Sequence, residues 1–570
     1  MIIDRAELTS LLTETLDLVD APPGCGAVLE GSIAEGFGNS ASDVDFLLLA
    51  DDDHDHPTMP TIVFVRGRRV EVRTRSLRQV RAQADAVCAH VAAGFGALPA
   101  ALLDRCQRLR GAVVLRGEDV VRRAREWPLS LPEVVAGWYA HHSRQAMRHA
   151  VASHVLGEEH EALAWAGIAA RHAAKSWVAA RGETYLEPKW LDQQFDRLAA
   201  GGDAEAIRLR ERLAGLRGGQ AGDAESARPP DEPVRPYDGG WAGTGLGEAE
   251  SAQPLDEHAA LVADFGVDGC AADPEQVLLG LRAGVTTWPI GDRLHVVRDR
   301  ADVFVLDAPA GRAWRSIAPG RPVGEVLRRA PGPAASALAE FHRIGLVELL
   351  WRDGGPIASA QPWAPAEPVT PPPSTRMPVL GLAGAAADGH VALVPLPAKR
   401  FAAAGMAQVW SHIMIENARE DLSGALDGGQ REVARTSGLR LLHHACRALL
   451  SACGMSPLPP DAAIVARLGA LTAVPAELTA QAAAVERELA GDEWELWAER
   501  LDKLVAGVRD LVRAEVFPAS FDSAAAWEAT LRIGHDWIRL GAYLDADFPI
   551  EEARDLLTSG GAQPHRRGGG

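Results

Sequence analysis

The stretch LEGSIAEGFGNSASDVDFLLLA, residues 29–50, constrains the fold more than any other part of this 570-residue chain. A glycine-rich turn separates two apolar runs, and Asp43 and Asp45 stand at the head of the second run. In a strand, side chains two residues apart project from the same face, so both carboxylates lie on one side while Val44 and Phe46 face the core. Two neighbouring anions repel each other unless a cation lies between them. The pattern therefore predicts a strand that begins at a cation site.

The residue types around this strand indicate which cation and which ligand belong there. Carboxylate oxygens are the hard ligands that Mg²⁺ prefers, and Mg²⁺ keeps positions open for water and substrate phosphates. Gly31 and Ser32 follow the apolar run AVLE, where a tight glycine turn exposes backbone N–H groups that attract phosphate. Gly36 and Gly38 allow the backbone to approach a ligand closely. Together these residues predict a metal-assisted nucleotide site.

The composition is that of a soluble protein with several domains, since 47% of the residues are hydrophobic and 24% are charged. Acidic residues number 77 against 58 basic ones, and the net charge of −19 disfavours binding to long nucleic acid. The N-terminus has no signal-peptide pattern, and no apolar run is long enough to span a membrane. The six cysteines form no CxxC pair. We therefore expect a cytoplasmic protein with reduced, mostly buried cysteines and no membrane association.

The hydrophobic patterns predict a multidomain α+β protein. Four short β-type runs, GAVLE, DVDFLLLA, TIVFVRG and RRVEVRTRS, fall within the first 85 residues, and long alanine-rich helical patterns follow. The patterns divide the chain into a small mixed-sheet unit at 1–85, a helical bundle unit at 86–217, a flexible linker at 218–256, a compact mixed module at 257–352, a Pro-rich linker at 353–376 and a C-terminal helical unit at 377–570.

Gly31-Ser32, ten further residues and then Asp43-x-Asp45 resemble the signature of the DNA polymerase β superfamily of nucleotidyltransferases, particularly its minimal and antibiotic-modifying branches. In that family a third carboxylate lies on a later strand beside the aspartate pair, and Glu71 in RRVEVRTRS matches it. The resemblance implies that residues 1–85 form a nucleotidyltransferase domain. It also implies that the three acids are catalytic and bind two Mg²⁺ ions, or Mn²⁺ in their place.

The same resemblance implies a reaction. An acceptor hydroxyl would attack the α-phosphorus of a nucleoside triphosphate such as ATP and expel pyrophosphate, while the metal ions neutralise the growing charge. Lys189, in GETYLEPKWLDQQF, matches the Lys-Trp segment of the helical second domain in aminoglycoside-type relatives, and Lys175 is an alternative. Glu35 departs from the family, in which many members place a basic residue there. The implied nucleotide contacts are Gly31, Ser32, Ser42 and Lys189.

The middle module carries a second resemblance. Its pattern predicts a hairpin of 294–298 and 303–306, followed by three short helices. The string VLD-x-PAGRAW…GRPVGEVL…LAEFHRIGLVEL is similar to the PqqD-like winged-helix family, in which a leader peptide adds as a strand to a sheet edge. The resemblance implies peptide contacts at Val303, Phe304, Val305, Leu306, Leu338 and Phe341. A spacer that only packs the two lobes together is the alternative.

These features favour a nucleotidyltransferase that modifies a peptide natural product or its precursor, with an NTP and a peptide as partners. One alternative is transfer to a small molecule of the antibiotic type, in which case the middle module is architectural. A second alternative is a non-catalytic peptide-binding scaffold or toxin–antitoxin regulator that has an inactive transferase lobe.

Overall fold

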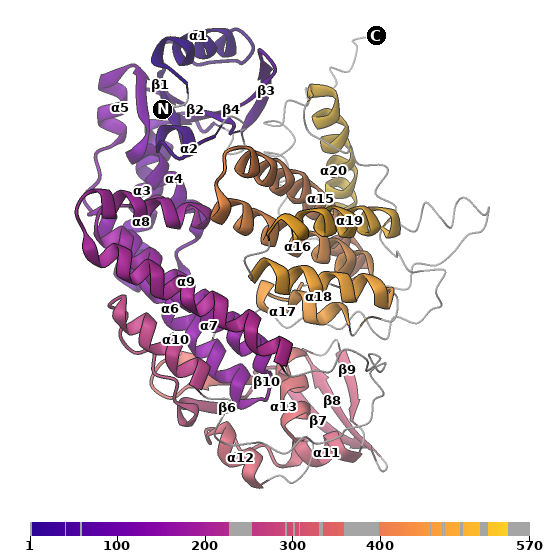
Figure 1. Ribbon diagram of the computed structural model, residues 1–570. Coiled ribbons are helices and arrows are strands. Elements are labelled where there is room, and N and C mark those ends of the chain that lie inside the picture. Colours follow the sequence, from indigo (N-terminus) through magenta and orange to yellow (C-terminus); the bar gives the residue numbers. More distant parts are fainter. Residues whose placement is uncertain are drawn as a thin grey trace, which may run out of the picture.

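The computed structural model shows a multidomain chain of helices and mixed sheets, in agreement with the predicted α+β class. In Figure 1 the strand-rich N-terminal unit (indigo) and the middle module (salmon) lie at opposite ends of a set of magenta helices, and the orange C-terminal helices lie beside them. The structure describes residues 3–544 except 40–41, 57–59, 227–252, 291–292, 300–301, 307, 330–333, 358–397, 456–457, 470, 472–473, 491–493 and 513–522.

The N-terminal sheet has five strands in the order β3-β4-β2-β1-β5. Their bounds are β1 Gly26–Glu30, β2 Val44–Ala50, β3 Thr61–Val65, β4 Arg68–Ser76 and β5 Val113–Arg116. β2 and β4 run parallel, and the remaining neighbours pair antiparallel. All four predicted strands are confirmed. The unit predicted to be helical at 86–217 also contributes a strand, because the short run VVLR at 113–116 pairs with β1, so the sheet extends beyond residue 85.

Helices cover both faces of this sheet. The helices of the unit are α1 Arg5–Leu16, α2 Gly31–Ala34, α3 Leu77–Ala93, α4 Ala100–Gly111 and α5 Glu118–Ala124. Phe46 and Leu48 belong to a core shared with α1, whereas Leu47 and Leu49 belong to a second core shared with α3, α4 and α5. The alternation of β2 side chains between two faces is therefore confirmed, and Val44 lies on the α1 side as predicted.

Five helices link the two sheet-bearing parts: α6 Leu131–Val155, α7 Glu159–Ala180, α8 Leu191–Ala200, α9 Ala204–Ser226 and α10 Gln253–Asp264. α7 ends shortly before Gly182, which has a φ of 98°, a value that favours glycine. The predicted linker is shorter than 218–256, since α9 and α10 enter it from both sides. The rest of that segment, 227–252, lies outside the described residues.

The middle module contains two three-stranded sheets and three short helices. The elements are β6 Val277–Leu281, β7 Val285–Ile290, β8 Arg293–Arg298, β9 Asp302–Leu306, α11 Ala308–Arg315, α12 Val323–Arg329, α13 Ala334–Arg343, β10 Val347–Trp351 and β11 Gly355–Pro356. The predicted hairpin is confirmed as β8 and β9, and the three predicted helices follow it. The Pro-rich linker begins later than residue 353, because β11 and the buried Ile357 belong to the module.

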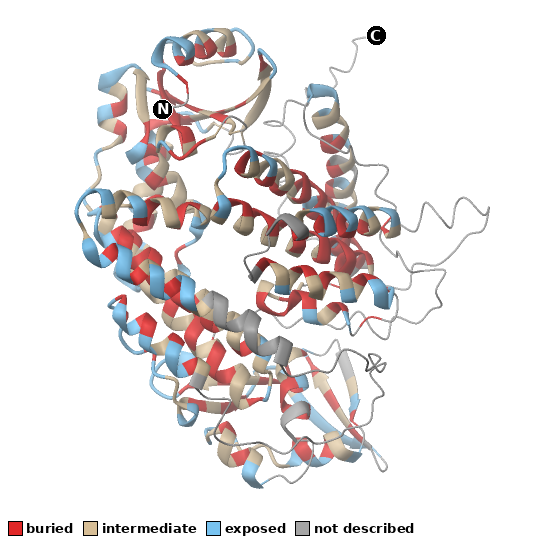
Figure 2. Cartoon of the chain, viewed as in Figure 1, coloured by how far each residue is buried: buried red, intermediate tan, exposed pale blue. Residues whose placement is uncertain are grey.

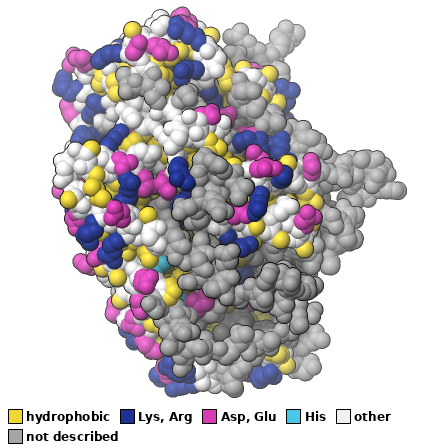
Figure 3. Space-filling view, viewed as in Figure 1, with side chains coloured by type: hydrophobic (Ala, Val, Ile, Leu, Met, Phe, Trp, Pro, Cys, Tyr) yellow, Lys and Arg dark blue, Asp and Glu magenta, His cyan; other side chains and the backbone are white. Residues whose placement is uncertain are grey.

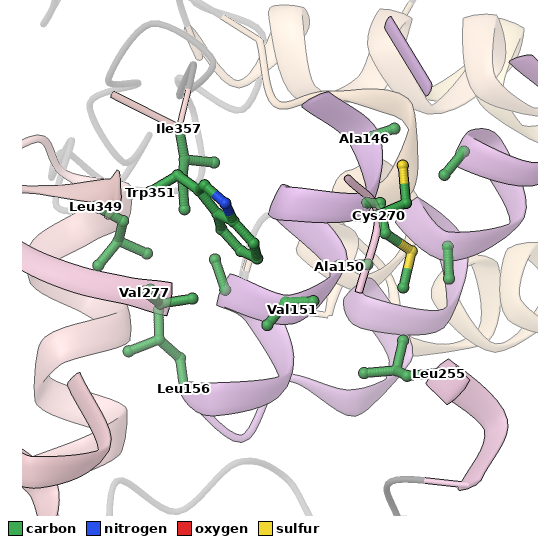
Figure 4. Packing of buried hydrophobic residues seen from close by; sticks show 14 of the residues in the cluster. Ala146, Ala150, Val151, Leu156, Leu255, Cys270, Val277, Leu349, Trp351 and Ile357 are labelled. Atoms are coloured by element: carbon green, nitrogen blue, oxygen red, sulfur yellow. The ribbon is translucent and has the colours of Figure 1, made fainter. Parts of the chain in front are cut away.

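The module and the helices that link the two sheet-bearing parts share one hydrophobic core. Figure 4 shows Val277, Leu349, Trp351 and Ile357 of the module facing Val151 and neighbouring side chains of α6. A guanidinium–aromatic contact between Arg148 and Trp351, 5.6 Å from the ring centre, lies at the same junction. The module therefore packs against α6 through apolar side chains, although the sequence pattern assigns the module and α6 to separate units.

The C-terminal helices form a separate core. They are α15 Ala398–Asp427, α16 Arg431–Ala452, α17 Asp461–Leu468, α18 Ala476–Ala490, α19 Trp494–Leu511 and α20 Ala524–Leu544. Figure 2 shows their buried residues on the sides that face one another. Phe37, Tyr185 and Trp190 from the earlier part of the chain belong to this core as well. The C-terminal helices thus pack against the glycine-rich turn that follows β1.

Two sequence expectations concern the chain as a whole. All six cysteines are free, and four of them are buried. Among the described residues, none of the helices has the length and apolar composition that crossing a bilayer requires. Acidic and basic side chains are interspersed over the described part of the face in Figure 3.

Candidate active site

Four carboxylates meet on one face of the N-terminal sheet. Asp45 on β2 lies directly across from Glu71 on β4 in the parallel register, and paired residues of neighbouring strands project from the same face. Asp43, two residues earlier, precedes the strand on the same side. The structure therefore brings together the three acids that the sequence singles out. Glu30, the last residue of β1, is the antiparallel partner of Asp45 and adds a fourth carboxylate.

Glu30 was not among the site residues predicted from the sequence. Its signal is present, because a charged residue ends the apolar run GAVLE immediately before the glycine turn. A hairpin-like antiparallel pairing of that run with DVDFLLLA would have placed Glu30 opposite Asp45.

The glycine-rich turn lies against this group of acids. Gly31 has a φ of 79°, and a Cβ atom there would lie 2.3 Å from Asp45 Oδ2, so any other residue would strain the backbone and displace the Asp45 carboxylate. The carbonyl of Ser32 accepts the N–H groups of Phe37 and Gly38 at 2.9 Å each, which closes the turn. Gly31 and Ser32, the nucleotide contacts that the resemblance implies, therefore lie next to the acids. The backbone of the turn folds around the Ser32 carbonyl.

Ser42, the third implied nucleotide contact, stands next to Asp43 in the chain. Its hydroxyl accepts the backbone N–H of Asn39 at 2.9 Å, and its own N–H donates to the Asn39 carbonyl at 3.1 Å. Asn39 Nδ2 also donates to Gln430 Oε1 at 3.1 Å, which connects this loop to the start of α16. Ser42 therefore shapes the approach to the acids through its contacts with Asn39.

Arginines supply the positive charge at the site. The two terminal nitrogens of Arg73 lie 3.0 Å from Glu30, 3.3 Å from Asp45 and 2.9 Å from Glu71. Arg69, two residues before Glu71, lies 2.5 Å from Asp43 and 2.8 Å from Glu420 of α15. These ion pairs offset the repulsion between the carboxylates that the sequence pattern predicts. Through Glu420, the C-terminal helix α15 contacts the edge of the site.

Burial changes the protonation of the acids. Burial in low-dielectric surroundings and, after it, the Asp45 carboxylate raise the pKa of Glu71, Arg73 opposes them, and the net result is a pKa of about 7. Burial likewise raises the pKa of Asp43 and of Glu30 above the usual range for these groups. Glu71 consequently exchanges its proton close to neutral pH.

The donor chemistry of the site fits a divalent ion, but the arginines compete for the same oxygens. The oxygens of Asp45 and Glu71, adjacent in register, are hard ligands of the type that Mg²⁺ binds. In the part of the chain that the structure describes, no three acidic, histidine or cysteine side chains are arranged to hold an ion. Arg69 and Arg73 draw the carboxylates toward themselves, so an ion would have to displace Arg73 from Asp45 and Glu71.

Lys189 lies at the junction with the C-terminal helices. It belongs to the short helix η2, Pro188–Trp190, and its ammonium group is 2.6 Å from Asp421 of α15. The adjacent Trp190 ring stacks on Phe37 of the glycine-rich turn, with ring centres 5.6 Å apart. The structure therefore brings the implied nucleotide contact Lys189 close to the turn and pairs it with an acid.

Lys175 is not available to a nucleotide, which corrects the alternative drawn from the sequence. Its side chain is 1% exposed and donates to the Tyr185 carbonyl at 2.5 Å and to Gln194 Oε1 at 2.7 Å. Burial lowers the pKa of this amine to about 7. Lys175 instead holds the segment that leads to Lys189.

Glu35, the residue that departs from the family pattern, is turned toward α4. Its Oε1 atom accepts from Gln107 Nε2 at 2.8 Å, and burial raises the pKa of the carboxyl. Arg197 of α8 donates to the Glu35 carbonyl, and its guanidinium lies 3.7 Å from the centre of the Phe37 ring. A basic residue thus contacts this turn after all, supplied by the helical unit.

The candidate peptide residues divide into two groups. Val303–Leu306 form most of β9, which lies at the end of the sheet β7-β8-β9, and Val305 is 51% exposed. Val305 shares its face of the sheet with its register partner His295 on β8 and with the exposed Trp288, which pairs with His295 from β7 at the other edge of the sheet. Leu338 and Phe341, by contrast, are 0% and 2% exposed, so they form part of the module's core.

Comparison of the chain with protein-family models, with curated proteins and with solved structures finds no match.

Proposed function

We propose that this protein transfers a nucleoside monophosphate from a nucleoside triphosphate to an acceptor, in a metal-dependent reaction at the carboxylates of the N-terminal sheet. The observation that carries the proposal is the register of Asp45 opposite Glu71, with Asp43 on the same face and Gly31 against Asp45. We propose in addition that the N-terminal unit is a nucleotidyltransferase domain and that the middle module is a winged-helix domain.

The residues of the site have separate roles in this proposal. Mg²⁺ or Mn²⁺, bound by Asp43, Asp45 and Glu71, would supply neutralisation of the triphosphate charge. Arg69, once released from Asp43, and Arg108, which is 3.8 Å from Asp45, are suited to bind phosphate oxygens.

The reaction follows from the position of these charges. The acceptor oxygen forms a bond to the α-phosphorus, the bond from that phosphorus to the bridging oxygen breaks, and pyrophosphate leaves. In this proposal the Glu71 carboxylate, which lies opposite Asp45 in register, takes the acceptor proton.

We propose a peptide natural product or its precursor as the acceptor. The position of β9 at the end of its sheet supports strand addition by an extended peptide. Val305, which is 51% exposed, offers an apolar contact on that edge strand, and Trp288, which is 58% exposed, lies on the same face two strands away on β7. A small-molecule acceptor of the antibiotic type would make no use of this edge.

A second candidate is a peptide-binding scaffold or regulator with an inactive transferase lobe. The ion pairs of Arg69 and Arg73 favour it, because they neutralise the carboxylates without a metal. The two candidates differ in one measurable property, the release of pyrophosphate from a triphosphate.

The test is transfer of label from each of the four α-³²P nucleoside triphosphates, with Mg²⁺ and with a cell extract or its peptide fraction as the acceptor. We expect labelled product and matching pyrophosphate release with wild-type protein. Substitution of Asp43 and Asp45 by Asn should lower both by at least about 100-fold, because the charge at the reacting phosphate is no longer balanced. Arg123→Gln, which breaks a surface ion pair with Asp51, is the control. Equal turnover in the double mutant would contradict the proposal, and an absence of pyrophosphate with all four nucleotides would favour the scaffold.

A further inference from the structure

Arg73 connects three strands of the N-terminal sheet through one guanidinium group. It lies on β4 two residues after Glu71, and therefore projects from the same face as that acid. Its Nη1 atom reaches Glu30 on β1 and Asp45 on β2, while its Nη2 atom reaches Glu71. These are the oxygens of two proposed metal ligands and of one acid that has no assigned role.

This position makes Arg73 a competitor of a divalent ion. A guanidinium remains protonated in proteins, so its charge cannot be removed by loss of a proton. An ion bound to Asp45 and Glu71 would share carboxylate oxygens that Arg73 holds at 3.3 Å and 2.9 Å. Two cations in that space repel each other strongly at low local dielectric constant. Binding of the ion therefore requires Arg73 to leave both acids.

Glu30 provides a place for Arg73 to go. Its side chain is 4% exposed, and its Oε1 atom lies 3.0 Å from Arg73 Nη1. A buried carboxylate requires a charged or hydrogen-bonding partner, so retaining Arg73 is favourable for Glu30 as well. Because Glu30 is the register partner of Asp45, a small movement of the guanidinium toward β1 keeps one ion pair while it frees Asp45 and Glu71.

We propose that Arg73 is a built-in counter-ion with two positions, bridging Asp45 and Glu71 in the absence of a divalent ion and held by Glu30 when the ion binds. Glu30 is then a positioning residue that acts through Arg73. The inference rests on the proposed function, because it assumes that Asp45 and Glu71 bind the ion. It implies that the free protein binds the metal weakly and that Arg73 sets this affinity.

The experiment is a titration of the full chain with Mn²⁺ alone, in which the EPR signal of free Mn²⁺ gives the dissociation constant. We expect Arg73→Gln to bind Mn²⁺ at least about tenfold more tightly than wild type, because a repelling charge is gone. Arg73→Lys, which keeps the charge, should stay within about threefold of wild type. Arg123→Gln, which removes the same kind of charge from an ion pair outside the site, should not change the constant.

A double-mutant cycle tests the role of Glu30. Glu30→Gln should weaken Mn²⁺ binding several-fold in the wild-type background and change it by less than about twofold when Arg73 is already Gln. An equal loss in both backgrounds would mean that Glu30 acts directly on the ion, which overturns its positioning role. Far-UV circular dichroism and thermal melting, measured for each variant, establish that the proteins compared are folded.

The outcomes separate this inference from the proposed function. Loss of Mn²⁺ binding in Asp45→Asn, together with an unchanged constant in Arg73→Gln, would overturn the counter-ion role and leave the metal site standing. Absence of Mn²⁺ binding in every variant, or unchanged binding in Asp45→Asn, would overturn the proposed function together with the inference.

Discussion

Gly31 and Asp45 approach each other so closely that a Cβ atom at position 31 would lie 2.3 Å from the Asp45 Oδ2 atom. The glycine also has a φ of 79°, so the backbone conformation and the available space both disfavour a larger residue. This contact joins the turn after β1 to the head of β2, and it places backbone atoms beside a carboxylate that we propose to be catalytic.

Gly31→Ala should therefore impair the site more than an ordinary glycine substitution does. Backbone strain alone costs about 1–3 kcal/mol, and the overlap with Asp45 adds to it, so we expect a lower melting temperature and at least about tenfold less nucleotidyl transfer. Gly24→Ala is a matched control, because Gly24 has a φ of 68° with no atom within 4 Å of an added Cβ. Equal loss of activity in both variants would show that strain, and not contact with Asp45, is responsible.

Nucleotidyl transfer should increase with pH between about 6 and 8. In the metal-free protein burial raises the pKa of Glu71 to about 7, so at pH 6 a proton competes with the divalent ion for this carboxylate. Glu71→Gln should be slow at every pH, with no rise across this range. The measurement is the initial rate against pH at saturating nucleotide and limiting Mg²⁺, and a flat wild-type profile would contradict this competition.

The raised pKa of Glu71 also predicts how the stability of the folded protein depends on pH. The folded Glu71 carboxyl, with a pKa near 7, keeps a proton that the unfolded chain releases near 4.5. The stabilisation from this group is therefore complete below pH 4.5 and is lost as pH rises through about 7. The melting temperature of wild type relative to Glu71→Gln should fall over this interval, and a constant difference would show that the carboxyl is not shifted.

Lys175 should have the opposite pH dependence. Burial lowers the pKa of its amine from 10.5 to about 7, so the folded chain binds fewer protons than the unfolded chain between these values. The melting temperature of wild type relative to Lys175→Met should rise as the pH increases from 7 to 9. Thermal melts in the two buffers test this, and a difference that is the same at both pH values would contradict the shift.

The exposed face beside β9 should affect only peptide acceptors. Val305→Arg places a charge on the exposed apolar face of β9, the proposed peptide-binding edge strand, so we expect the KM for a peptide acceptor to rise by about tenfold with little change in kcat. Ile207→Arg is the matched control, since Ile207 on α9 is also 51% exposed. Unchanged KM in Val305→Arg would favour a small-molecule acceptor and an architectural middle module.

Local periodicity determined much of this fold. The alternation in DVDFLLLA was enough to predict β2, the common face of Asp43 and Asp45 and the inward direction of Phe46, because strand geometry repeats every two residues. The hairpin of β8 and β9 and the end of α7 before Gly182 were also predictable, because turn residues and short-range sequence patterns specify them.

Only the tertiary structure decided how these elements combine. Strand β5 and the insertion of Arg73 among three acids depend on pairing between segments well separated in the chain, which no local pattern records. The burial of Lys175 and of Leu338 depends on which helices pack over them, so residues that the sequence offers as ligand contacts became core residues. Periodicity thus determines on which face of its strand or helix a side chain lies, whereas the docking of distant segments determines which residues that face contacts.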